Sequence, residues 1–410
     1  MLLYENKKGK LISLLKVGLN PFKKFVSTGE IKEELGLVKS RKHLIESIAK
    51  LGENKHQNII LPVIGDVGVG KTHFFWALKD KLLYYNTIYI SLENIYKNFY
   101  YNIYSEFIEE MGIKALRSIT SDLCNQWGAL EKKFGFFHLA DINKVRNTGF
   151  SELSDQFENK MVLKEVLNVI TTHQLDPYKK IEAENWLLGE PMDYKDLSRL
   201  NTNHDLKNKK YAFTILKLSL ENSKLGCLLF IDDFERLISM IKRSEQEEEE
   251  SEDDIFSSSW LYGRDESAPD ALEAQKIFKK ISTLNKIKGL KIILTLKSKD
   301  SLEEIKRRLS EENYQDLISI IEEPIYLDPF TESDFFHFYK KIMKNYLNNL
   351  DFLDFFEENP DILFPLNEKL LKRVYESSKG NPRQVIKALI KIFNKIIYSN
   401  ESIDDILLEF

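Results

Sequence analysis

A glycine-rich run ahead of residue 73 contains the residue types that bind the phosphates of a nucleotide. The run reads Gly65, Asp66, Val67, Gly68, Val69, Gly70, Lys71 and Thr72. Glycines let backbone N–H groups curl around phosphates, a lysine at this spacing reaches the β and γ phosphates, and the threonine that follows can ligate Mg²⁺. We therefore predict that the whole run binds ATP or ADP, that Thr72 holds Mg²⁺ and that Lys71 also serves catalysis. His73 is included in this nucleotide-binding segment as a residue at the surface or core edge of the next helix, without a catalytic role.

An acidic pair follows another apolar run and suits a metal ion. Residues 228–231 are apolar and precede Asp232 and Asp233, with Glu235 two positions later. A buried strand that ends in a carboxylate can deliver it beside Mg²⁺ at the phosphate end of a sheet. We predict that Asp232 holds the metal and that Asp233, or alternatively Glu235, is the general base. The simpler interpretation is that Asp233 and Glu235 are surface residues at the end of a strand.

Polar and basic residues at three further places could contact a γ-phosphate. Thr295 and Ser298 end an apolar run, and either could sense that phosphate, although ordinary polar residues at a strand end fit the pattern equally well. Arg383 lies in the first turn of a predicted helix, from which its guanidinium could close over the nucleotide, or it is simply a surface arginine at a helix start. Arg307 and Arg308 could act on a neighbouring subunit as an arginine finger, or belong to a solvated helix face.

A mostly parallel sheet is needed to position these residues. Short apolar runs predict strands at residues 58–64, 87–92, 227–231, 291–296 and 324–327. Helical patterns alternate with the runs, which indicates an α/β fold whose sheet is covered on both faces. The fold class we predict is a parallel-sheet core of the P-loop NTPase type with a long helical insertion and a C-terminal helical lid.

Three regions are predicted along the chain. They are a helical lead-in at 1–57, a nucleotide-binding core at 58–330, and a helical lid at 331–410 whose last helix starts near Pro382. Within the core, residues of about 112–205 are predicted to form the insertion, and residues 244–268 an acidic flexible loop. Helices are predicted around 101–111, 114–134, 161–171 and 178–188. An acidic arm that mimics nucleic acid or blocks a basic surface is the alternative to a plain connector.

Composition limits the compartment and the partners. The chain has 410 residues, a net charge of −5 and two cysteines, Cys124 and Cys227. The charge provides no global attraction to nucleic acid, so any such binding requires a local basic patch. Two cysteines suit a reducing compartment, and no apolar run reaches the roughly 18 residues that a membrane-spanning helix needs. We expect a cytoplasmic protein with no membrane contact.

The motifs together resemble those of a known ATPase group. The run 65–72, the pair Asp232-Asp233 and the turn Gly380-Asn381-Pro382-Arg383 are similar to the AAA+ and STAND ATPases, especially their origin-recognition branch. The resemblance covers roughly residues 20–95 and 215–395. It implies ATP or ADP with Mg²⁺ as ligand, nucleotide-dependent homo-oligomers, and DNA or a protein as the partner of the insertion. The second acidic residue is Asp233 rather than the usual glutamate and no clear arginine finger is present, so hydrolysis is expected to be slow.

Two narrower resemblances concern short segments. Residues 230–236 look like the corresponding strand of KAP-type NTPases, and residues 185–190 are similar to the P-loop ATPases of bacteriophage-exclusion defence systems. Two hypotheses follow. The chain is an ATPase that assembles on or remodels a nucleic-acid or protein complex, in DNA transactions or antiviral defence, or it is a STAND-like switch that hydrolyses little and signals by lid opening and oligomerisation.

Overall fold

The computed structural model shows an α/β protein that divides into two compact units. The structure describes residues 9, 13, 15, 20–23, 42–53, 56–91, 97–133, 136–139, 141–241, 273–348, 363–399 and 405–406. The first unit comprises Met1–Glu53, Val63–Leu82 and Pro324–Phe410, and the second comprises Asn54–Pro62 and Leu83–Glu323. The predicted acidic loop at 244–268 lies outside the described residues.

A five-stranded parallel sheet forms the core, in the order β2-β5-β6-β1-β7. The strands are β1 Ile59–Ile64, β2 Tyr85–Ile90, β5 Gly226–Ile231, β6 Leu290–Leu296 and β7 Ile325–Tyr326. All residues of β1, β5 and β6 are buried, as expected for strands covered on both faces. The five predicted strands are therefore confirmed, with bounds shifted by no more than two residues.

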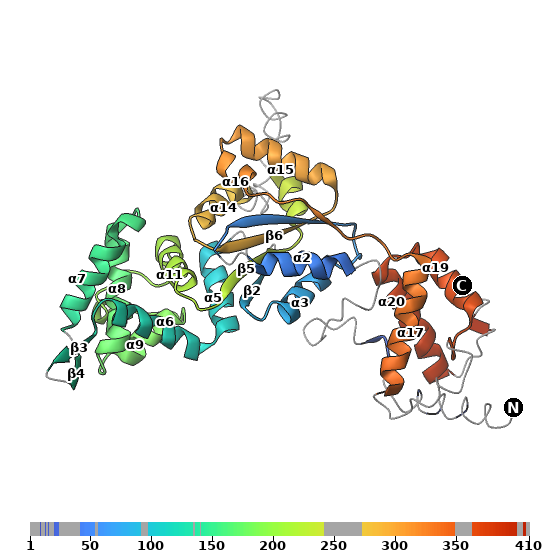
Figure 1. Ribbon diagram of the computed structural model, residues 1–410, viewed down its shortest axis with the longest axis horizontal. Helices are drawn as coiled ribbons and strands as arrows, with labels where there is room; N and C mark the ends of the chain where they lie inside the picture. The colour runs from blue at the N-terminus through green and yellow to red at the C-terminus, as the bar shows by residue number, and fades with distance from the viewer. Residues whose placement is uncertain are drawn as a thin grey trace, which may run out of the picture. The chain divides into compact units, whose positions relative to one another are not determined.

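Helices of the second unit lie on both sides of its strands (Figure 1). Helix α5 (Phe99–Met111) packs against β2, and α11 (Lys209–Glu221) packs against α5. Near β6 lie α14 (Ile277–Asn285), α15 (Lys299–Glu311) and the short α16 (Gln315–Ser319). The alternation of strands and helices predicted for this part of the chain is thus present.

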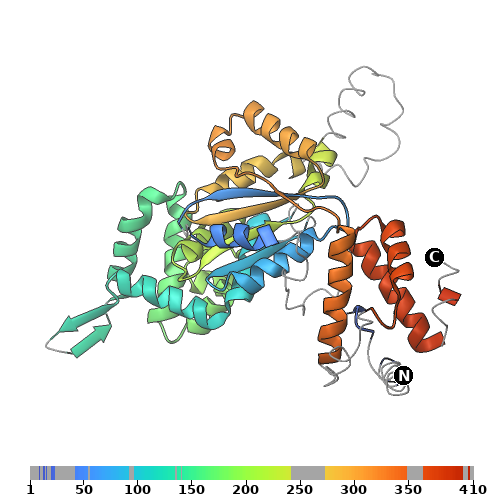
Figure 2. The same ribbon diagram turned by 45° about the vertical axis from the view of Figure 1, so that its right-hand side comes forward.

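The insertion is mainly helical, but it contains a hairpin that the sequence pattern did not predict. Its helices are α6 Ile113–Gln126, α7 Ile142–Leu153, α8 Lys160–Leu175, α9 Lys180–Leu187 and α10 Tyr194–Arg199, with a short 3₁₀ turn at Ser154–Gln156. Instead of one helix over 114–134, α6 ends at Gln126 and strands β3 (Leu130–Lys133) and β4 (Phe136–Leu139) follow, extending away from the helices in Figure 2. Gly128 has a φ of +84°, a conformation that cannot continue a helix, and the backbone turns there.

A polar cluster, buried at His173 and exposed at Arg117, joins three helices of the insertion. The guanidinium of Arg117 on α6 donates two hydrogen bonds of 2.7 Å to Glu184 on α9. The fully buried ring of His173 on α8 lies 3.0 Å from the same carboxylate through Nε2 and 3.1 Å from the Thr120 hydroxyl through Nδ1. The hydrogen bonds from Arg117 lower the pKa of Glu184 to about 2, and burial lowers the pKa of His173.

Acid is expected to destabilise this cluster. The pKa of Glu184 lies below its ordinary value of 4.5, so its stabilising contribution is present above pH 4.5 and lost as the pH falls towards 2. The pKa of His173 is also lowered, from 6.5, so protonation of the unfolded chain adds to the loss of stability below pH 6.5. We expect Glu184→Gln to lower the free energy of unfolding by roughly 1 kcal/mol at pH 7 and to flatten its fall between pH 4.5 and 2.

Urea denaturation of the whole chain over a pH series measures this effect. Glu152→Gln is a matched control, because Glu152 is an exposed carboxylate on α7 of the same insertion. The control should leave the pH dependence unchanged. Equal slopes of the free energy of unfolding against pH in the wild type and in Glu184→Gln would show that the ion pair with Arg117 does not contribute to acid sensitivity.

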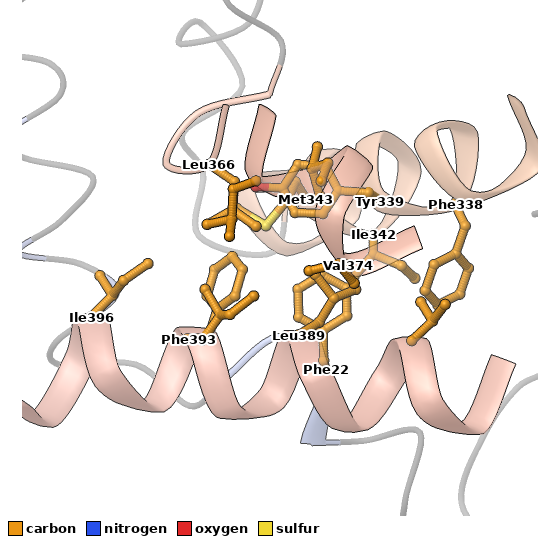
Figure 3. Packing of buried hydrophobic residues seen from close by; sticks show 14 of the residues in the cluster. Phe22, Phe338, Tyr339, Ile342, Met343, Leu366, Val374, Leu389, Phe393 and Ile396 are labelled. Atoms are coloured by element: carbon orange, nitrogen blue, oxygen red, sulfur yellow. The ribbon is translucent and has the colours of Figure 1, made fainter. Parts of the chain in front are cut away.

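The C-terminal helices of the first unit pack around a common apolar core (Figure 3). They are α17 Glu332–Asn348, α19 Glu368–Ser378 and α20 Pro382–Asn394, followed by a π-helical turn at Lys395–Ser399. Phe22, from the other end of the chain, lies in this core and stacks on Tyr339 with ring centroids 6.0 Å apart. The Asn20 amide donates to the carbonyl of Ile390 at 3.0 Å and to Asn394 Oδ1 at 2.9 Å. Residues 20–22 therefore belong structurally to the C-terminal helices.

The predicted absence of membrane spans has a structural counterpart. Among the helices in the described parts of the chain, none combines the length and apolar character that crossing a bilayer requires.

Candidate functional site

The glycine loop, residues 65–70, connects the buried strand β1 to helix α3 (Lys71–Lys81). Gly68 has a φ of +86° and Gly70 a φ of +105°, both in the left-handed region that glycine adopts without strain. Gly70 precedes the first turn of α3, and no side chain caps that helix. A strand, a tight loop and an uncapped helix N-terminus are the arrangement that the spacing of the glycines predicts.

Lys71 is held inside this loop. Only 7% of the residue is exposed, and its Nζ donates to the carbonyl of Gly65 at 2.7 Å and to that of Asp66 at 3.4 Å. The ammonium is thus positioned by backbone oxygens at the start of the loop. Thr72 and His73 follow it on α3 and are partly buried.

Two loop residues beside Lys71 face solvent. Asp66 and Val67 are exposed, and the side chain of Asp66 accepts a hydrogen bond of 2.7 Å from the N–H of Val67. Val69, in contrast, is fully buried. The loop is therefore anchored at Val69, whereas Asp66 and Val67 are exposed.

The start of α20 forms hydrogen bonds with the glycine loop, within the first unit. The Asn381 side chain donates to the carbonyl of Val67 at 2.8 Å, and the N–H of Arg383 donates to the carbonyl of Gly68 at 3.1 Å. Asn381 Oδ1 also caps α20 by accepting from the N–H groups of Arg383 and Gln384. The structure therefore brings Arg383 to the glycine loop, and its side chain is exposed there.

Asp232 lies at the end of β5 in the second unit and is held by three donors. Its Oδ1 accepts from the Thr295 hydroxyl at 2.6 Å and from the N–H of Asp233 at 3.0 Å. Its Oδ2 accepts from the Tyr89 hydroxyl at 2.8 Å. Because Asp232 is only 6% exposed, these bonds fix the carboxylate in one orientation.

Thr295 and Ser298, the two candidate phosphate sensors, have different surroundings. The Thr295 hydroxyl donates to Asp232 and accepts from the N–H of Asp233 at 2.8 Å, so it positions the carboxylate of Asp232. Ser298 is the N-cap of α15 and accepts from the N–H of Ser301 at 3.3 Å. In this conformation Thr295 acts on Asp232, whereas Ser298 starts a helix.

Of the two candidate general bases, Asp233 lies in the turn after β5 and Glu235 lies in the helix that begins at residue 234. Asp233 has a φ of +53°, and its side chain is 49% exposed and 3.9 Å from the guanidinium of Arg236. A left-handed non-glycine residue costs about 1–3 kcal/mol and occurs often at functional sites. Glu235 is partly buried. Of the two carboxylates, Asp233 is thus the one with the strained backbone.

Tyr89 is a member of this site that sequence reasoning missed. It lies near the end of β2, opposite Phe230 of β5, and their rings stack with centroids 6.0 Å apart. Burial, and then the charge of Asp232, raises the pKa of its hydroxyl, so it remains a donor to that carboxylate. The place of this tyrosine near the end of a predicted strand is a weak sequence signal, because Tyr89 and Asp232 are 143 residues apart in the chain.

Arg307 and Arg308, the candidate arginine fingers, are both paired with glutamates of their own helix. Arg308 is 7% exposed, and its Nε donates to Glu304 at 2.7 Å. Arg307 is exposed and bonds Glu304 and Glu311. Of the two alternatives, the solvated helix face therefore fits Arg307, whereas the side chain of Arg308 is buried.

The candidate residues thus form two groups. Lys71 and Thr72 belong to the first unit with Asn381 and Arg383, and Asp232 belongs to the second unit with its neighbours. The strand that ends at Asp232 and the strand that leads into the glycine loop are separated in the sheet only by β6. Compared with protein-family models and with curated proteins, the chain finds no match.

Proposed function

We propose that this chain is an ATPase whose glycine loop binds the phosphates of ATP. One observation carries the proposal: a loop with two left-handed glycines joins a buried strand to an uncapped helix, with Lys71 held inside it. Helix N-termini attract anions through their N–H groups and dipole, and the lysine adds a full positive charge. No feature of the described chain suits a triphosphate as well.

In the proposed site, Thr72 and Asp232 hold Mg²⁺. The support for this assignment is topological: the carboxyl ends of parallel strands lie at one edge of a sheet, and the sheet order is β5-β6-β1. Mg²⁺ prefers oxygen ligands such as a hydroxyl and a carboxylate. In this assignment Asp233, with its half-exposed carboxylate, orients the attacking water.

Contact between α20 and the glycine loop supports a link between nucleotide and helix. The Asn381 side chain and the N–H of Arg383 donate hydrogen bonds to two successive carbonyls of the loop. A phosphate that binds the N–H groups of the loop shifts or polarises these carbonyls. The hydrogen bonds from Asn381 and Arg383 pass this change to the start of α20. We assign the output of the site to movement of the C-terminal helices and to a nucleotide-dependent change in oligomeric state.

Binding and turnover measurements on the wild-type chain test this function. MgATP or MgADP at about 100 times its Kd should raise the free energy of unfolding by about 2.7 kcal/mol. ATP should be hydrolysed slowly, and the oligomer size should differ between ATP and ADP. The absence of stabilisation by ATP, ADP and GTP, together with no turnover above background, would overturn the proposal.

A nucleotide-gated switch with little hydrolysis is the second candidate function. The observation that favours it is that both oxygens of Asp232 already accept hydrogen bonds, which compete with direct coordination of a metal. A switch should co-purify with tightly held ADP and release it only when a partner is added. Rapid exchange and continuous turnover of a purified, empty protein would exclude this candidate.

Tyr89→Phe should separate the effect of the tyrosine hydroxyl from that of its ring. The variant keeps the stacking on Phe230 but removes the donor to Asp232 Oδ2. Since that oxygen then loses a competitor for Mg²⁺, we expect half-maximal turnover at a roughly three- to tenfold lower Mg²⁺ concentration. Tyr85→Phe, at the other end of β2, is the control and should leave this concentration unchanged. A higher Mg²⁺ requirement in Tyr89→Phe would mean that the hydroxyl assists the metal site.

A further inference from the structure

A cavity of about 680 Å³ in the second unit is lined by five lysines. It lies where α5, α8 and α11 begin, away from Asp232 and its neighbours. The lysines that line it are Lys97, Lys207, Lys209, Lys210 and Lys280. One carboxylate, that of Glu273, lines it as well. We call this site the lysine cavity.

Among the described residues, little negative charge balances the lysines of the lysine cavity. Lys280 pairs with Glu273 at 2.9 Å, and the same glutamate pairs with Lys276 at 2.8 Å. The ammonium groups of the other four lysines are exposed and form no ion pair or side-chain hydrogen bond with any described residue. Like charges gathered in a concave site repel one another and create a field that attracts anions.

Three helix starts add to this field. The residues that precede α5, α8 and α11 are Asn98, Asn159 and Asn208, and all three line the cavity. Each helix N-terminus contributes about half a positive charge. The side chains of Asn159 and Asn208 cap their helices, whereas the side chain of Asn98 does not cap α5. The N–H groups at the start of α5 thus lack a side-chain acceptor from Asn98.

The arrangement of the lysines favours a chain of phosphates over one small anion. They come from three separate places: before α5, around the start of α11, and on α14. Exposed, flexible ammonium groups are the usual contacts of a phosphodiester backbone, which they neutralise without reading sequence. A site for a single small anion would instead gather buried, fixed donors around one point.

Apolar and aromatic groups beside the lysines suit nucleobases. Met161 is 65% exposed at the cavity, and the exposed His204, whose ring contacts that of Tyr211 at 5.4 Å, belongs to the same lining. Bases stack on such faces without sequence preference, which is typical of proteins that bind single strands. A duplex, with its bases paired inside, cannot stack its bases on these groups.

We propose that the lysine cavity binds the phosphate backbone of a single-stranded nucleic acid. The site lies wholly within the second unit and does not depend on nucleotide binding by the glycine loop. It provides the local basic patch that a chain with a net charge of −5 needs for such a ligand. Failure of ATP binding would therefore leave this proposal standing, and failure of this proposal would leave the ATPase standing.

The test compares two sets of four Lys→Gln substitutions in the full chain. The cavity variant changes Lys97, Lys207, Lys209 and Lys210. The control variant changes Lys114, Lys164, Lys195 and Lys288, which are exposed lysines of the same unit outside the cavity lining. Both variants lose the same charge, and thermal denaturation checks that both remain folded.

Binding of a fluorescent 20-nucleotide oligo-dT is measured by anisotropy over a range of salt concentrations. The cavity variant should bind about tenfold or more weakly at low salt, and its slope of log affinity against log salt should be smaller by about 0.7 for each phosphate that a lysine no longer neutralises. The control variant should stay within about twofold of wild type. Equal losses in the two variants would overturn the proposal.

Two competitors identify the source of the phosphates. Inorganic tripolyphosphate at equal phosphate concentration should displace the oligonucleotide poorly, because it lacks bases and length. A blunt DNA duplex should bind more weakly than oligo-dT and show no dependence on the four cavity lysines. Effective displacement by tripolyphosphate, or duplex binding that needs the same lysines, would contradict a single-stranded ligand.

Discussion

Lys71→Ala is expected to lower ATP turnover by roughly 10²- to 10³-fold and to abolish stabilisation by MgATP at millimolar concentration. The ammonium of Lys71 is the positive charge that the structure holds inside the glycine loop, 2.7 Å from the carbonyl of Gly65. In the proposed site it leaves the loop carbonyls in part and binds the β and γ phosphates, where charge develops during hydrolysis. Alanine removes this charge and keeps the helix.

Stability must be measured alongside turnover, because Lys71 is buried and its loss leaves the Gly65 carbonyl without its 2.7 Å donor. That loss is expected to cost about 1 kcal/mol, which leaves the chain folded. Lys81→Ala is the matched control: it removes a lysine from the end of the same helix, where the side chain is 46% exposed and pairs with Asp80. Unchanged turnover in Lys71→Ala would mean that the measured hydrolysis does not take place at the glycine loop.

Gly380→Ala should lower the free energy of unfolding by roughly 3 kcal/mol or more. Gly380 has a φ of +70°, and a β-carbon added to it would clash with the carbonyl oxygen of Phe330. The conformation costs about 1–2 kcal/mol for alanine, and displacing backbone adds about 1–3 kcal/mol. The carbonyl of Gly380 also accepts from the N–H of Phe330 at 2.8 Å, so the clash breaks a bond that holds this turn.

A second glycine isolates the steric part of this effect. Gly128, just after α6, has a similar φ of +84°, but no heavy atom lies within 4 Å of its added β-carbon. Gly128→Ala should therefore cost only about 1–2 kcal/mol. Denaturation curves of both variants give the comparison, and nucleotide affinity should fall only in Gly380→Ala, because Asn381 and Arg383 follow that turn. Equal losses of stability would show that the carbonyl of Phe330 moves aside easily.

The strands and the glycine loop could be predicted because their signals are local. An apolar run of four to eight residues bounded by glycines or acidic residues is too short for a typical helix and favours a buried strand, and β1, β5 and β6 are buried at every position. The start of α20 was likewise predictable, because Pro382 suits the first turn of a helix and Asn381 caps it.

The features that the sequence did not indicate depend on partners distant in the chain. Tyr89 joins the acidic site only because β2 pairs with β5, which lies more than a hundred residues later. The lysine cavity combines residues 97, 207–210 and 280, and no window of sequence contains them together. The β3–β4 hairpin was hidden for another reason, since its residues continue an apolar pattern that also suits a helix.

The packing of Asn20 and Phe22 among the C-terminal helices has a consequence for the order in which the chain folds. The bond from Asn20 to the carbonyl of Ile390 spans 370 residues. Closing so long a loop delays folding, because the chain must lose conformational entropy before the stabilising contacts can form. The second unit, in contrast, is formed almost entirely by the continuous segment Leu83–Glu323. During synthesis on the ribosome this segment can fold first, while Phe22 stays exposed until α20 has been made.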